Sequence, residues 1–242
     1  MAARLPTRLL AVLALSFVAG IFFWHTWPLY PFKLLVVLMH ESGHAAAALL
    51  VGGSVQRIVV DPREGGYTLS LLPTSLWSQI VVASAGYVGS TISGCALLLL
   101  AARSKTGRWP VVALAAWTAA VAALWVRDSF TLLFVAGASL VLALVARFGP
   151  SLLRRGLLVF LATFSVSYAL YDIRDDLLHF ASSGAQSDAD ALAQATLVPA
   201  VVWGIAWGLV SVVVVALTLR AVLGSRTPAS RAAPAFPRRS AV

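Results

Sequence analysis

The chain has 242 residues, of which 60% are hydrophobic and 11% are charged. Soluble domains average about 45–50% apolar and about 25% charged residues, so the composition excludes an ordinary soluble protein and predicts a polytopic membrane protein. The net charge of +9 does not indicate nucleic-acid binding, because Lys and Arg gather at the chain ends and in short loops between apolar runs. Membrane topology explains that distribution. The single cysteine, Cys95, excludes an intramolecular disulfide.

Apolar runs divide the chain into about seven spans, each near the ~20 residues that a bilayer requires. The first run, Leu9 to Trp24, predicts a retained helix, with a cleaved signal peptide as the alternative. The second begins at Pro31 and ends at Gly52-Gly53, which favour helix termination. The later runs cover residues 78–103, 109–126, 130–148, 156–171 and 197–223.

These runs predict an all-α polytopic membrane protein, a bundle of about six to seven transmembrane helices with one small β-hairpin after the second helix. We expect a single transmembrane domain over residues 1–223 and a basic, disordered tail over residues 224–242, which is rich in Pro, Ala, Ser and Arg. In the span at 78–103, Gly86, Ser90 and Gly94 fall four apart and predict close helix packing.

The predicted hairpin occupies residues 54–76. Val55 to Val60 is rich in β-branched residues, Asp61 to Gly66 has turn chemistry, and Tyr67 to Leu71 alternates. We expect it at the membrane surface. Its role stays open between a capping loop and a free edge that pairs with an extended substrate strand.

The second span contains His40-Glu41-Ser42-Gly43-His44. Positions i and i+4 of a helix share one face, so His40 and His44 can bind one metal ion. Glu41 can reach a water on that ion as a general base. An ionisable residue in an apolar span costs at least about 2.5–3.5 kcal/mol on insertion scales, and such residues are functional by default. A zinc site is therefore favoured over histidines that only bridge helices.

A third protein ligand has to come from elsewhere in the chain. Asp172, Asp175 and Asp176 form the one dense carboxylate cluster, at the end of the span that starts near residue 156. A solvated helix end is the alternative interpretation. We predict Asp172 as the third ligand because it is closest to the apolar run, with Asp176 or Asp175 next. Further on, Ser187 or Asp188 is predicted to cap a short helix.

The sequence resembles the M50 class of intramembrane zinc metallopeptidases, the site-2 protease type, and more closely its bacterial M50B-like branch. The resemblance spans roughly residues 33–215. It rests on His40-Glu41-Ser42-Gly43-His44-Ala45, Asp61-Pro62-x-x-Gly65-Gly66, Ser84-Ala85-Gly86-Tyr87-x-Gly89-Ser90, and Asp172-x-x-Asp175-Asp176 followed by Ser187-Asp188-Ala189.

This resemblance implies a zinc endopeptidase that hydrolyses peptide bonds of membrane-spanning substrates, with Zn²⁺ as cofactor, His40 and His44 as metal ligands and Glu41 as catalytic base. One feature departs from the family. Its usual third ligand, an Asp-Gly within an Asn- and Pro-containing segment, has no counterpart here, so Asp172 is chosen by position.

The expected partners are a transmembrane protein substrate and the lipid bilayer, and not nucleic acid. We expect a multi-pass protein of a bacterial cell membrane, with its tail in the cytoplasm and the hairpin outside. Two other functions remain: a non-proteolytic metal-binding membrane scaffold of the same fold, and a metal-ion carrier, which would need more polar residues along its spans.

Overall fold

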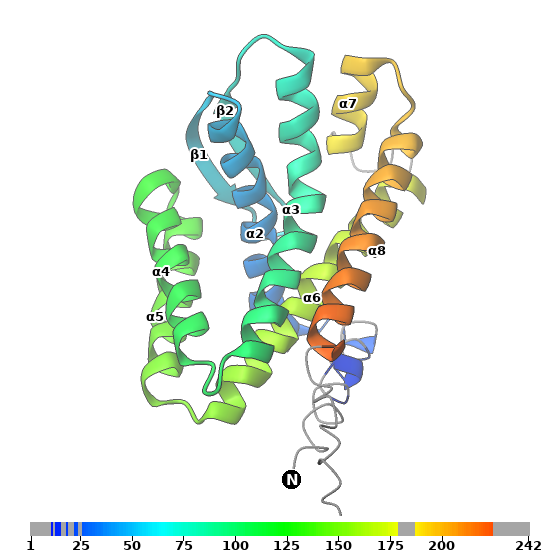
Figure 1. The fold of residues 1–242 in the computed structure, drawn as a ribbon. Coiled ribbons are helices and arrows are strands. Elements are labelled where there is room, and N and C mark those ends of the chain that lie inside the picture. Colours follow the sequence, from blue (N-terminus) through cyan, green and yellow to red (C-terminus); the bar gives the residue numbers. More distant parts are fainter. Residues whose placement is uncertain are drawn as a thin grey trace, which may run out of the picture.

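The computed structural model describes residues 26–178 and 187–224, together with residues 11, 13–15, 18, 22 and 23. For residues 170–178 it describes the backbone alone. The helices are η1 (Trp27–Leu29), α2 (Tyr30–Leu50), α3 (Leu76–Arg103), α4 (Arg108–Trp125), α5 (Ser129–Phe148), α6 (Ser151–Leu178), α7 (Asp188–Thr196) and α8 (Ala200–Gly224). The strands are β1 (Ser54–Val60) and β2 (Gly66–Leu71). This arrangement confirms the predicted fold class (Figure 1).

Five helices of the described chain, α3, α4, α5, α6 and α8, are long and apolar enough to cross a membrane. With α2, they agree with the predicted bundle. The predicted first helix, Leu9 to Trp24, and the predicted tail lie mostly or wholly outside the described residues and stay predictions. Between α4 and α5, Asp128 caps α5 by accepting a hydrogen bond from the Thr131 backbone N–H at 2.8 Å.

The helix α2 lies at the centre of the bundle, between α3, α6 and the hairpin (Figure 1). Thirteen of its 21 residues are buried, including Lys33 and Glu41, so protein rather than lipid surrounds most of the helix. Because neighbouring elements supply polar partners, an apolar helix can hold these ionisable groups. Gly52, with a φ of 82°, follows its last turn in the left-handed conformation that suits a helix end.

The small residues of α3 allow two close helix contacts, as predicted. Gly86 lies against α2, where an added Cβ would overlap the rings of His40 and His44. Gly94 lies against α6, where an added Cβ would come within 2.7 Å of the Ala162 carbonyl oxygen. Between them, the Ser90 carbonyl accepts a hydrogen bond from Ser165 Oγ of α6 at 2.9 Å. One face of α3 therefore joins α2 to α6.

The predicted hairpin is confirmed, and it packs along α2. Its strands are antiparallel, with Ser54 opposite Leu71, Val60 opposite Gly66, and a bulge between Val55 and Arg57. Ile58 of β1 is fully buried, and it lies opposite Thr68 of β2. The hairpin thus brings the inner face of β2 against the middle of α2.

Two contacts hold the hairpin turn to the start of α2. Tyr30 Oη donates a hydrogen bond to the Pro62 carbonyl at 2.8 Å. Lys33 Nζ forms an ion pair with Glu64 Oε1 at 2.6 Å, and the Lys33 side chain is almost fully buried. Glu64 adopts a φ of 72° in this turn. Together these contacts fix the position of β2 along the axis of α2.

Candidate metal centre

The two histidines of the sequence motif lie one helical turn apart on α2, and their ring centroids are 4.8 Å from each other. Both are buried. His44 Nδ1 lies 2.7 Å from the Val82 carbonyl oxygen of α3. A carbonyl oxygen only accepts, so Nδ1 carries a hydrogen, and Nε2 is the nitrogen that faces Asp188 and that a metal ion could take in place of a proton. This is the arrangement that a metal-binding imidazole needs.

Asp188 brings a carboxylate to the two histidines from a distant part of the chain. Its Oδ2 lies 3.2 Å from Nε2 of His40 and 3.2 Å from Nε2 of His44. Burial by itself would raise the pKa of the Asp188 carboxyl, but the hydrogen bonds and charges of the two imidazoles lower it well below its usual range. Asp188 is therefore ionised, as a metal ligand must be.

The helix α7 explains how Asp188 reaches this position. Ser187 is the N-cap: its Oγ accepts from the Asp190 backbone N–H at 3.1 Å, and Asp190 in turn accepts from the Ser187 backbone N–H. These two hydrogen bonds pair backbone N–H groups at the start of α7 without using Asp188. The carboxylate of Asp188 can therefore face the histidines. Ala189 and Leu192 are buried and pack in one cluster with Tyr87 and Trp207, which anchors the short helix.

The three donors fit a zinc ion. Their ligand atoms all lie within 4.8 Å of one another. Ligands at ~2.0–2.2 Å from a tetrahedral centre lie about 3.3–3.6 Å apart, so the two distances of 3.2 Å are close to the short end of this range. Two imidazoles and one carboxylate form the set that catalytic zinc sites use, with a position left for water.

Two aromatic side chains support His40 from the side of α3 and α8. The Tyr87 ring packs edge-on to His40 with centroids 5.0 Å apart, and Trp207 stacks on Tyr87 at the same separation. Trp207 Nε1 donates a hydrogen bond to Ser84 Oγ at 3.0 Å. Gly86 and Tyr87 of α3 thus form one wall of the centre.

Glu41 lies beside the histidines, buried, and is held by Thr68 of β2. Thr68 Oγ1 is 2.8 Å from Glu41 Oε2 and 2.9 Å from the Glu41 carbonyl oxygen. Gly66 lies two residues before Thr68 on the same face, and an added Cβ there would come within 3.0 Å of Glu41 Cγ. This contact could not be predicted from sequence patterns, because it depends on the register between the hairpin and α2.

A cavity of about 530 Å³ opens beside these groups. His40, Glu41, His44 and Asp188 line one part of it, and the strand β2 with its preceding turn lines another. Water and an extended peptide could therefore reach Glu41 along β2.

The predicted ligand Asp172, and the alternatives Asp175 and Asp176, lie in the part of α6 for which the structure describes the backbone alone. That prediction falls outside the described side chains. The structure brings Asp188 to the histidines, a residue predicted only as a possible helix cap. The signal was present in Ser187-Asp188-Ala189-Asp190: once Ser187 and Asp190 cap each other, Asp188 has no capping role.

Comparison with known proteins identifies the family of the chain. Residues 12–218 match the family described as Peptidase M50B-like. No curated protein and no solved structure matches the chain. Since the match covers most of the sequence, and five apolar helices accompany it, this integral membrane protein belongs to the M50B-like peptidase family.

Proposed function

We propose that the chain is an intramembrane zinc endopeptidase, of the site-2 protease type, that hydrolyses peptide bonds of membrane-spanning substrates. The observation that carries the proposal is the convergence of His40, His44 and Asp188 beside Glu41, in one cavity. A zinc ion bound there supplies a Lewis acid that lowers the pKa of a water to about 7 and polarises a carbonyl.

In this proposal His40 and His44 hold the ion through Nε2. Asp188, rather than the predicted Asp172, is the third protein ligand. The hydrogen bond from His44 to the Val82 carbonyl fixes the ring orientation. Such outer partners typically change metal affinity by about 10–100-fold when they are removed.

Glu41 is the general base and acid. Its carboxylate takes the proton from the attacking water, holds it, and passes it to the leaving amine. Thr68 fixes the carboxylate, since its hydroxyl contacts Oε2 while β2 is anchored by the Lys33–Glu64 pair. A positioned base of this kind contributes about 10²–10⁴-fold to the rate.

The strand β2 is proposed to receive the substrate. It pairs with β1 on one side, and it lines the cavity that holds Glu41. A helical peptide has to unwind before a backbone carbonyl is accessible, and pairing with a strand edge holds the unwound segment extended. This favours the substrate-edge role of the hairpin over a plain capping loop.

The test is Glu41→Gln, co-expressed with a single-span substrate. We expect cleavage to fall by at least 10²-fold while zinc content stays near that of the wild type, because Glu41 is not a ligand. Unchanged cleavage would overturn the assignment of Glu41. A wild-type protein that holds zinc but cleaves no single-span substrate would support the non-proteolytic scaffold.

A further inference from the structure

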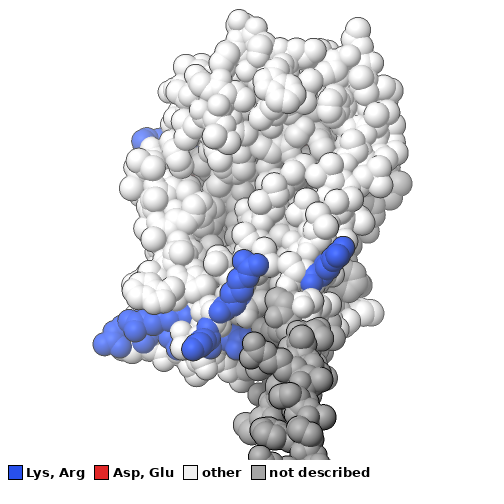
Figure 2. Space-filling view, viewed as in Figure 1, with Lys and Arg blue, Asp and Glu red and all other residues white. Residues whose placement is uncertain are grey.

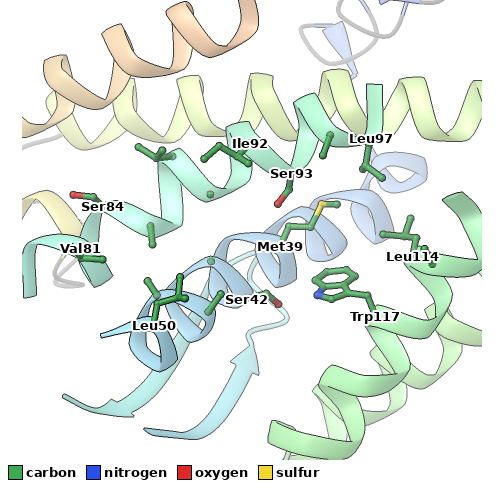
Figure 3. A pocket seen from close by; sticks show the side chains of 18 of the residues that line it. Met39, Ser42, Leu50, Val81, Ser84, Ile92, Ser93, Leu97, Leu114 and Trp117 are labelled. Atoms are coloured by element: carbon green, nitrogen blue, oxygen red, sulfur yellow. The ribbon is translucent and has the colours of Figure 1, made fainter. Parts of the chain in front are cut away.

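A second cavity lies between α2, α3 and α4. It is an open groove of about 890 Å³. Figure 3 shows Met39 and Ser42 of α2, Ser93 and Leu97 of α3, and Trp117 of α4 around it. Apart from three serines its lining side chains are apolar or aromatic, and none of the proposed metal ligands lines it.

The groove opens on the side of the bundle that faces lipid. Residues along its rim are strongly exposed: Leu50 by 85%, Ile92 by 52% and Leu100 by 45%. Two of its walls, α3 and α4, are membrane spans by length and composition. Hydrocarbon is the natural filling of an apolar groove at this depth, because water there would lack polar partners.

One end of the groove carries positive charge. Leu100 and Pro110 line that end, and the loop between them holds Arg103, Lys105 and Arg108. All three side chains are exposed, and none forms an ion pair within the described residues. In Figure 2, Lys and Arg gather at this end of the molecule, and no Asp or Glu shows on this face.

The same loop packs on the start of α6, which adds further cations. A Cβ on Gly107 would lie 3.0 Å from Arg155 Cγ and 3.2 Å from Arg154 Cβ. Between Glu64 and Asp172 the only acidic residue is Asp128. It caps α5 beyond the far end of α4, about 27 Å away at 1.5 Å per residue. Among the side chains that the structure describes, these cations therefore have no acidic partner and can attract an anion.

The dimensions suit one leaflet of a bilayer. From Arg103 to Ser93 the helix α3 rises about 15 Å, which is half of a hydrocarbon core of about 30 Å. An acyl chain that starts at the level of Arg103 therefore ends near Ser93 and Trp117, in the middle of the groove (Figure 3).

We propose that this groove binds an anionic phospholipid, with its phosphate against Arg103, Lys105 and Arg108 and an acyl chain along Leu97, Leu100 and Leu114. The charge favours a lipid over a substrate helix, since an apolar peptide span needs no cluster of cations, whereas basic pockets between helices bind anionic headgroups. This proposal does not depend on peptidase activity.

The first test uses native mass spectrometry of the full chain, exchanged from detergent into an equal mixture of phosphatidylglycerol and phosphatidylcholine. We expect phosphatidylglycerol to be retained at least tenfold over phosphatidylcholine. Replacing Arg103, Lys105 and Arg108 together by Gln should lower the ratio of retained phosphatidylglycerol to phosphatidylcholine at least tenfold. Each cation near an anionic headgroup raises lipid affinity by about fivefold. The matched control replaces Arg57 and Arg63 of the hairpin by Gln and should change nothing.

The second test fills the groove. Ala96 is exposed and lines it, whereas Ala136 is exposed on α5 and does not. Ala96→Trp should lower lipid retention at least fivefold and Ala136→Trp should not, with an unchanged elution volume in size-exclusion chromatography as the check that both variants fold. If Ala96→Trp is poorly folded, Ala113→Leu makes a smaller change in the same groove. Equal retention in the groove-filling variant and its control would overturn the proposal, as would cross-linking of a co-expressed single-span peptide, rather than lipid, to position 96.

Discussion

The two cavities beside α2 and α3 differ in every property that matters for chemistry, although one helix pair lines both. The metal cavity faces the hairpin and α7 and contains buried imidazoles and carboxylates. The groove faces α4 and contains methyl groups, indoles and three serine hydroxyls. Only a close helix contact separates them, in which Gly43 lies against the Ala85 carbonyl. Adjacent positions of α2, such as Met39 and His40, therefore belong to different cavities.

The direction in which a residue of α2 points, rather than its distance along the chain, decides whether it lines the metal cavity or the groove. Ser42 lies between Glu41 and Gly43, yet it lines the groove and donates its hydroxyl to the Leu38 carbonyl at 2.7 Å. Substitutions on the two sides of this helix contact test whether the metal cavity and the groove are independent.

The largest effect is expected for Asp188→Ala. The variant loses one of three proposed ligands, and we expect zinc affinity to fall at least 100-fold, with cleavage lost in parallel. Metal analysis of the purified protein measures this. Asp172→Ala is the matched variant: retention of zinc in it and loss in Asp188→Ala supports the assignment, and the reverse result returns the third ligand to Asp172.

A smaller loss is expected for Gly86→Ala. The added methyl group would overlap the rings of both histidines, so the rings must move, and zinc affinity should fall by about 10–100-fold. Gly89→Ala is the partner on the groove side, where the new Cβ would lie 3.3 Å from Gly43 Cα. Its zinc content should stay near that of the wild type. Equal loss in the two glycine variants would mean that general helix packing, rather than the rings, decides metal binding.

Thr68→Val tests how Glu41 is positioned. The isosteric change removes a hydrogen bond to a charged group, worth about 1.5–3 kcal/mol, so kcat should fall by about 10–100-fold while KM and zinc content stay the same. Thr68→Ser restores the hydroxyl and should restore most of the rate. Ser42→Ala on the groove side should leave kcat unchanged. A Thr68→Val variant that loses zinc would show instead that the hairpin supports the metal ligands.

The smallest effect is expected for Ser187→Ala. Loss of the N-cap costs about 0.5–2 kcal/mol of local helix stability, which should loosen α7 and weaken zinc binding only several-fold. Hydrogen exchange over residues 187–196, with and without added zinc, measures it. Protection that is the same in variant and wild type would mean that the packing of Leu192, rather than the cap, holds α7.

Local patterns predicted most of the fold. The spans, the hairpin, the small face of α3 and the pair of histidines each depend on residues close in sequence. The described part of the chain has all of them except the first predicted span, which lies mostly outside it. Asp188 and Thr68 could not be identified in this way. Each reaches the centre through tertiary packing: Asp188 through the burial of Leu192, and Thr68 through the register that places β2 beside Glu41. The density of carboxylates along the sequence pointed to Asp172. Such a density carries no information about which helix end meets α2 in the fold.

The ribosome makes the two halves of the centre at different times, because they lie far apart in the sequence. His40 and Asp188 are 148 positions apart, with four of the five apolar spans between them. Domains are synthesised at about 5–20 residues per second, so a nascent chain holds the histidines and Glu41 for roughly 7–30 s before its third proposed ligand exists. If Asp188 is the third ligand, the ribosome-bound chain would have an incomplete metal site during that interval, and the proposed peptidase would be inactive toward other spans that are being inserted beside it.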